Sequence, residues 1–144
     1  MAAVEHLLDA GPLVALIDAG DRDHEWSRKT LGRLRPPLIT CEAALSEALF
    51  LLRNDRQAPE KIALLFQRGL IATHPILDTD AGAVLELMST YSNVPMSLAD
   101  SCLVRLSEKI PSSVVVTLDS DFTIYRKNRN KKIPLLAPPR LTRR

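Results

Sequence analysis

The sequence predicts an α/β fold in which a parallel sheet of four to five short strands is covered by helices on both faces. Three observations support this prediction. Short apolar runs alternate with longer helical segments, the runs are apolar on both faces, and β-branched residues dominate the clearest of them, residues 113–118 (SVVVTL). Because crossovers between parallel strands are almost always right-handed, few topologies remain possible.

Each element has a local signal. Pro12 suits the first turn of a helix, and Thr40 is a predicted N-cap. Arg33 ends a helix that begins with acids, and Gly69 and Pro111 end two other helices. The predicted strands are residues 5–10, 36–40, 70–77, 113–118 and 132–138, and the predicted helices are residues 11–20, 21–34, 41–54, 58–69, 78–92 and 97–110.

The composition is that of an ordinary globular protein. The chain has 144 residues, of which 46% are hydrophobic and 25% charged, which suffices for one domain with a sizeable core. No apolar run approaches the roughly 18 residues of a membrane span, and the N-terminus lacks the features of a signal peptide. Cys41 and Cys102 lie far apart in predicted helices, without metal-binding spacing. We therefore expect a cytoplasmic protein with two inert packing thiols.

Charge is distributed unevenly along the chain. Residues 126–144 contain eight basic residues and no acid, whereas residues 1–125 contain 11 basic and 17 acidic residues. A basic segment attached to an acidic body either binds nucleic acid or is simply a solvated end of the chain, and charge alone does not separate the two.

Four carboxylates stand in unusual positions. Asp9 and Asp119 each follow a predicted strand, at the edge of a parallel sheet where sites form when the strand order reverses. Glu47 and Asp100 lie beside apolar residues on predicted helices, where a charge needs a partner. Each acid also has a purely structural explanation. The alternatives are a helix cap at Asp9, an ion pair of Glu47 with Arg53 or another base, a capping box formed by Ser97 and Asp100, and an N-cap at Asp119.

Taken together, the four acids favour a metal site. Two unit charges ~4 Å apart repel by ~4 kcal/mol at an effective dielectric constant of ~20, so a cluster must either stay partly protonated or bind cations. Mg²⁺ and Mn²⁺ prefer such oxygen ligands, and the sequence offers no histidine or cysteine cluster typical of zinc. The pattern predicts metal-assisted hydrolysis of a phosphodiester.

Four segments resemble the acidic motifs of PIN-domain ribonucleases, most closely those of the small VapC-like toxins of type II toxin–antitoxin modules. In chain order they are residues 7–16 (LLDAGPLVAL), 45–52 (LSEALFLL), 97–106 (SLADSCLVRL) and 114–122 (VVVTLDSDF). The fourth is the most specific, and the resemblance extends from about Leu7 to Leu136. It implies one PIN-like (Rossmannoid) domain over residues 1–136, followed by a basic tail at 137–144.

The resemblance also assigns roles to residues. It implies four metal-binding, catalytic acids: Asp9, Glu47, Asp100 and Asp119. Thr117 matches a hydroxyl residue that orders the site. Asp121 is either a fifth acid that reaches the metal through water or only a cap. His24 follows the first motif where the family often has a histidine, and Pro12 replaces a common serine or threonine, which puts the metal affinity in question.

As a function, the resemblance implies an endoribonuclease that uses Mg²⁺ or Mn²⁺, forms a homodimer and is bound by a cognate antitoxin protein. The substrate would be single-stranded or structured RNA, held by its backbone. The predicted phosphate contacts are Arg126, Lys127, Arg129, Lys131 and Lys132. The apolar positions of residues 58–70 form either a dimer face or part of the core.

Other readings remain open at this point. A receiver domain needs an acidic pair after its first strand, and so does a phosphatase with an Asp-x-Asp nucleophile. The first predicted strand of this chain ends in one acid, which disfavours both classes of enzyme. A non-catalytic PIN-like interaction module and an RNA-processing nuclease without an antitoxin are the remaining alternatives.

Overall fold

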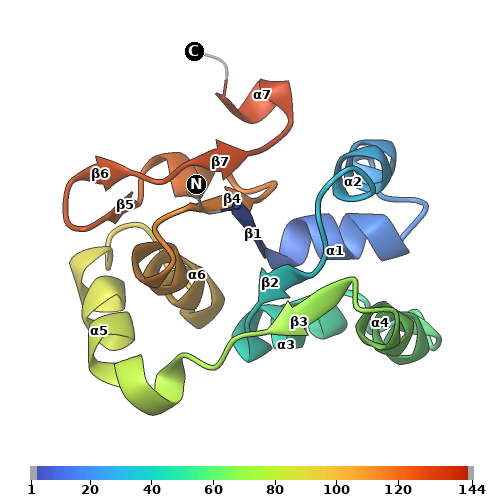
Figure 1. The fold of residues 1–144 in the computed structure, drawn as a ribbon, viewed down its shortest axis with the longest axis horizontal. Coiled ribbons are helices and arrows are strands. Elements are labelled where there is room, and N and C mark those ends of the chain that lie inside the picture. Colours follow the sequence, from blue (N-terminus) through green and yellow to red (C-terminus); the bar gives the residue numbers. More distant parts are fainter. Residues whose placement is uncertain (1–2, 143–144) are drawn as a thin grey trace.

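The computed structural model describes residues 3–142 and contains a five-stranded, entirely parallel sheet in the order β3-β2-β1-β4-β7. The strands are β1 (Glu5–Leu8), β2 (Leu38–Thr40), β3 (Ile71–Thr73), β4 (Ser113–Val116) and β7 (Leu135–Leu136). Helices cover both faces, with α5 and α6 on one side and α1, α2 and α4 on the other (Figure 1). The predicted fold class is confirmed.

The helices fall close to the predicted segments. They are α1 (Ala10–Ile17), α2 (His24–Leu31), α3 (Glu42–Leu51), α4 (Ala58–Gln67), α5 (Leu77–Thr90), α6 (Leu98–Lys109), the 3₁₀ helix η1 (Ser120–Thr123) and the short α7 (Pro139–Thr142). Gly69, at φ +70°, ends α4 as predicted. Within the described part of the chain, no helix is long and apolar enough to cross a membrane.

The prediction for Thr40 is wrong. This residue is the last of β2, and its hydroxyl donates to the carbonyl oxygen of Leu8 at 2.8 Å. Cys41 takes the N-cap position of α3 instead, without a side-chain capping bond. Because the strand runs directly into the helix, the threonine side chain is used to join two strands rather than to cap.

Alternating residues of the central strands build two cores. Leu7 of β1 and Val115 of β4 pack into the cluster under α5 and α6, whereas their neighbours Leu8 and Val116 pack into the cluster under α1, α2 and α4. All four are at most 1% exposed. Burial on both faces explains why these strands lack the polar alternation of a half-exposed sheet.

The strand order reverses at β1. From β1 the chain proceeds to β2 and then β3 on one side, and returns to place β4 on the other side of β1. The carboxyl ends of β1 and β4 are therefore adjacent, and Asp9 N donates to Val116 O at 3.0 Å across them. This is the switch point at which open α/β sheets place their ligands.

A hairpin that the sequence did not reveal follows η1. Strands β5 (Arg126–Lys127) and β6 (Lys131–Lys132) pair antiparallel through a turn in which Asn128 and Arg129 have positive φ. The hairpin lies beside α5 and α6 (Figure 1). Its regular pairing is too short to leave a strand signal in the sequence.

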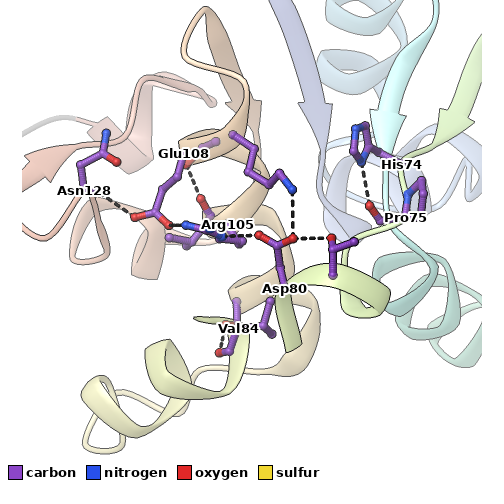
Figure 2. Close-up of polar contacts among 12 residues, drawn as sticks. His74, Pro75, Asp80, Val84, Arg105, Glu108 and Asn128 are labelled. Carbon is purple, nitrogen blue, oxygen red and sulfur yellow. Dashed lines mark hydrogen bonds and ion pairs between the residues drawn. The ribbon is translucent and has the colours of Figure 1, made fainter. Parts of the chain in front are cut away.

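The hairpin is attached to the domain by a polar network on α5 and α6 (Figure 2). Asp80 accepts from Arg105 Nε at 2.7 Å and from Lys109 Nζ at 2.9 Å. Arg105 also binds Glu108 at 3.1 Å, and the other Glu108 oxygen accepts the Asn128 N–H at 2.7 Å. The network thus joins the start of α5, the exposed side of α6 and the hairpin turn.

The C-terminal helix α7 contacts the body of the domain. Arg140 of α7 forms a bidentate contact with Asp23, the N-cap of α2, at 2.6 and 2.8 Å. The guanidinium of Arg140 lowers the pKa of Asp23. The last two basic residues of the predicted tail, Arg143 and Arg144, lie outside the described residues.

Candidate metal centre

The side chain of Asp9 is held at the switch point by two hydrogen bonds. Its Oδ1 accepts from Ala10 N at 2.8 Å, which makes it the N-cap of α1, and its Oδ2 accepts from the Thr117 hydroxyl at 2.7 Å. The residue is 5% exposed. The predicted capping role is therefore real, but it occupies a single oxygen and does not neutralise the charge.

Thr117 connects the two strand ends. While its hydroxyl donates to Asp9, the same oxygen accepts the N–H of Asp119 at 2.9 Å. Asp119 in turn accepts the N–H of Asp121 at 2.9 Å as the N-cap of η1. One buried hydroxyl thus fixes the positions of the first and fourth predicted acids relative to each other.

Asp100 enters the centre from the first turn of α6. Ser97 caps this helix by accepting the Asp100 N–H at 3.0 Å, as the capping-box pattern predicted. The Asp100 carboxylate is 6% exposed and accepts from the hydroxyl of Tyr125 at 2.9 Å. Tyr125 is fully buried and packs edge-on against Tyr91 and Phe122, each at 5.2 Å between ring centroids.

Glu47 lies in the middle of α3 and is half-buried. The predicted alternative, an ion pair with Arg53, is not formed. Arg53 instead donates to the carbonyl of Phe50 and lies over its ring at 4.4 Å. Among the described residues, Glu47 has no ion-pair or side-chain hydrogen-bond partner.

The pKa shifts show that these acids share one electrostatic environment. Burial raises the pKa of Asp9 to about 7, against the Thr117 hydrogen bond, and Asp100 and Glu47 raise it further. Burial, then Asp100 and Asp119, raise the pKa of Glu47. Burial raises the pKa of Asp100, and so does Asp119. Burial and then Asp119 also raise the pKa of Asp121. The four predicted acids, with Asp121 beside them, do converge.

This cluster carries negative charge without a matching base. Within residues 3–142, none of the five acids forms an ion pair with lysine, arginine or histidine. In the same part of the chain, no three acid, histidine or cysteine side chains stand close enough together to enclose a bare ion. Mg²⁺ usually keeps several waters and takes few direct protein ligands, so the all-carboxylate donor set fits a hydrated divalent cation.

Comparison with known proteins identifies the family of the chain. The family model of the PIN domain matches residues 6–128. The chain belongs to the PIN domain family.

This PIN domain also has a solved structural neighbour. The crystal structure of VapC20 from Mycobacterium tuberculosis, described as a sarcin–ricin loop cleaving toxin, superposes with a TM-score of 0.73. The match covers 83% of this chain and 94% of that one at 20% sequence identity, so it establishes a common fold. No curated protein matches the sequence. The resemblance to the PIN family that the four motifs indicated is confirmed.

The predicted phosphate contacts of the PIN domain differ in their availability. Arg129, Lys131 and Lys132 are exposed on the hairpin. Arg126 is half-buried, and its Nη1 donates to the carbonyls of Thr123, Ile124 and Tyr125, which fixes the guanidinium at the end of η1. Lys127 is buried, at 9% exposure.

His24 is placed at the start of α2, where its Nδ1 lies 2.7 Å from the carbonyl oxygen of Ala15 in α1. This contact links two helices and accounts for the position of the ring. A role for His24 in the centre stays a prediction.

Sequence reasoning missed Tyr125. Its hydroxyl is the hydrogen-bond donor to Asp100. One signal was available, because Tyr125 lies three residues after Phe122, just beyond η1, and a buried tyrosine hydroxyl usually requires a partner.

Proposed function

We propose that this PIN domain is a Mg²⁺- or Mn²⁺-dependent endoribonuclease that acts in the cytoplasm as the toxin of a toxin–antitoxin pair. The observation that carries the proposal is the cluster of buried and half-buried carboxylates at the switch point of the sheet, which has no cationic partner in residues 3–142. Such a cluster is destabilising unless a cation or protons occupy it.

The proposed metal ligands and catalytic groups are Asp9, Glu47, Asp100 and Asp119. When bound, the metal would lower the pKa of a water molecule and stabilise the leaving oxygen of the phosphodiester. The chain's own contribution is orientation. Thr117 fixes Asp9 and the backbone of Asp119, and Tyr125 fixes Asp100. Asp121 is held next to Asp119 and is proposed to contact the metal through water.

The proposed substrate is RNA, bound through its backbone. The exposed cations Arg129, Lys131 and Lys132 on the β5–β6 hairpin supply phosphate contacts that the acidic centre cannot. Because the structural neighbour VapC20 is described as cleaving the sarcin–ricin loop, a hairpin RNA of that kind is a suitable first substrate beside total cellular RNA.

Two partners complete the proposal, a second copy of the chain and a cognate antitoxin. Large apolar side chains are exposed on α3 and α4, including Phe50 at 63%, Leu51 at 54% and Leu64 at 45%. Exposure of this kind supports a protein contact of the domain. Size-exclusion chromatography with light scattering tests the homodimer, and co-purification with the product of an adjacent small gene tests the antitoxin.

The decisive experiment incubates the purified chain with RNA in Mg²⁺, in Mn²⁺ and in EDTA, beside Asp9→Ala. The matched control is Asp78→Ala, which removes an exposed acid from the first turn of α5. We expect discrete cleavage by the wild type and the control in metal, and loss of more than ~100-fold in Asp9→Ala or in EDTA.

A second readout does not depend on knowing the substrate. If the acids bind metal, Mn²⁺ raises the Tm of the wild type and of Asp78→Ala but not that of Asp9→Ala. Cleavage that persists in EDTA or in Asp9→Ala would contradict the proposed site. Absence of both cleavage and any metal effect on Tm would favour the non-catalytic interaction module.

A further inference from the structure

The fold brings the two cysteines of the chain together. Cys41 is the N-cap of α3 and Cys102 lies in the second turn of α6, and these two helices pack against each other. Both residues are free thiols and belong to the same core cluster, 2% and 1% exposed. The sequence, which separates them by a long stretch of chain, predicted two unrelated packing residues.

Two further observations show that the thiols are neighbours. They line the same small cavity, of about 80 Å³, at the carboxyl edge of β2 and β3. The side chains of the two thiols also interact with each other. A disulfide requires Cα atoms within about 7 Å of each other, and two cysteines that line one small cavity at the contact of α3 and α6 are placed to approach this condition.

The cavity gives a small oxidant access to the pair. Its wall is formed by both cysteines together with Pro75, Leu77 and Asp78, which are exposed, so the space connects the cysteine residues with the surface. A volume of this size holds a few water-sized molecules. Hydrogen peroxide fits such a space, whereas a bulky oxidant, such as the disulfide of a tripeptide, does not.

We propose that Cys41 and Cys102 form an oxidisable dithiol that closes reversibly to an intrachain disulfide when the protein meets hydrogen peroxide. One thiol, as thiolate, attacks a peroxide oxygen, which breaks the O–O bond, releases water and leaves a sulfenic acid. The second thiol then attacks that sulfur, forms the S–S bond and releases a second water. Two electrons pass from the two sulfurs to the peroxide, and a dithiol reductant reverses the change.

The cross-link would join helices that carry two of the clustered acids. Asp100 lies two residues before Cys102 on α6, and Glu47 follows Cys41 on α3. The disulfide fixes these helices relative to each other next to the candidate metal centre. Its formation does not depend on the proposed function, whereas its effect on metal binding does.

The test oxidises the folded chain with hydrogen peroxide, quenches it, and counts thiols in urea before and after dithiothreitol. We expect the two free thiols to disappear together, with loss of two hydrogen atoms in the intact mass, and to return on reduction. Peptide mapping should identify a Cys41–Cys102 cross-linked fragment, and a non-reducing gel should show a single chain.

The matched control is Cys41→Ala, in which Cys102 lacks a partner and should instead gain oxygen as sulfenic or sulfinic acid. The proposal is overturned if the wild type keeps both thiols, if each gains oxygen independently, or if the cross-link joins two chains. Because the wild-type result alone decides these outcomes, a folding defect of the variant does not affect the conclusion.

The effect on the metal centre is measured separately. We expect the oxidised protein to need about tenfold more Mn²⁺ for half of its maximal rise in Tm, and reduction to reverse this. An unchanged Mn²⁺ requirement would overturn the link to the centre, whereas a lack of any Mn²⁺ effect in the reduced protein would count against the proposed function instead.

Discussion

Two aspartates of this chain, Asp9 and Asp80, are almost equally buried and are used in opposite ways. Asp9 is 5% exposed and lies among other acids at the switch point of the sheet, with hydrogen bonds from a hydroxyl and a backbone N–H. Asp80, on α5, is 7% exposed and binds two cations of α6, Arg105 and Lys109 (Figure 2).

The pKa values of the two side chains move in opposite directions. Burial raises the pKa of Asp9 to about 7. Hydrogen bonds from Thr79, Lys109 and Arg105 lower the pKa of Asp80 below its usual range, although burial opposes them. Burial by itself therefore does not separate an acid of the candidate centre from an acid in a structural ion pair, whereas the presence of cationic partners does.

The Asp80 network and the acids around Asp9 contribute to folding in different ways. The Asp80 network is electrically satisfied by the protein itself and joins α5, α6 and the hairpin. The acids around Asp9 repel one another in the metal-free protein, and their arrangement persists because strand ends, caps and the Thr117 bridge position them. Repulsion of this kind among clustered acids is typical of a functional site that binds a ligand.

The largest change in Tm is expected when Asp80 or Asp9 is replaced by asparagine. Asp80→Asn should lower Tm by several degrees, because Arg105 and Lys109 would lose their shared counter-charge and face each other. Asp9→Asn should raise the Tm of the metal-free protein at pH 8, because a buried charge that repels its neighbours is removed. Thermal unfolding followed by circular dichroism measures both.

The control for both exchanges is Asp78→Asn, an exposed acid whose replacement should change Tm little. If Asp9→Asn lowered the metal-free Tm as much as Asp80→Asn, the acids of the centre would be structural after all, and the contrast between the two regions would disappear.

A second, smaller effect should appear in the pH dependence of stability. The folded-state pKa of Asp9 is about 7, above its ordinary value of 3.8, so the folded state binds this proton more tightly than the unfolded state. Stability from this group is present below about pH 4 and is lost as pH rises toward 7. The metal-free Tm should therefore fall over this range, less so in Asp9→Asn.

The contribution of Asp80 to stability should change with pH in the opposite direction to that of Asp9. The folded-state pKa of Asp80 is below 3.8, so its contribution is present above about pH 4 and is lost as pH falls further. The difference in Tm between wild type and Asp80→Asn should accordingly be largest near neutral pH and narrow in acid. A difference that is independent of pH would argue against an electrostatic role for Asp80.

A third prediction concerns the bridge between the strand ends. Thr117→Val keeps the shape of the side chain but removes both hydrogen bonds, so Asp9 is no longer oriented and its pKa rises further. We expect the affinity for Mn²⁺, measured by calorimetry, to fall about 10- to 100-fold. Thr90→Val, at an exposed position at the end of α5, serves as the matched control. Equal affinities in both variants would exclude Thr117 from the centre.

Much of the fold was readable from the sequence because its signals are local. The run Val114–Val116 and the helix formers of residues 41–54 identify a buried strand and a helix without any tertiary information. The position of Asp9 and Asp119 after strands then predicted their convergence, because parallel strands end at one edge. The hairpin and the role of Thr40 were not readable, since both depend on contacts with distant residues.

The side-chain partners of the centre were the least predictable part. The ion-pair partners of Asp80 are an example, because nothing in its local sequence shows that Arg105 and Lys109 lie one helix away. The contact between Cys41 and Cys102 was hidden for the same reason. A sequence gives the residue types at an element's end, whereas the pairing of elements decides which charges meet.

The smallest expected effect isolates a single hydrogen bond in the centre. Tyr125→Phe keeps the buried ring and its contacts with Tyr91 and Phe122 but removes the donor to Asp100. One such bond contributes about 1 kcal/mol, so we expect the Mn²⁺ affinity to fall about fivefold with little change in the metal-free Tm. Tyr91→Phe is the matched control, because its hydroxyl accepts from Arg126 N rather than contacting an acid. If both variants lowered the Mn²⁺ affinity equally, the aromatic cluster would support the centre only by packing, and Asp100 would be oriented by its helix alone.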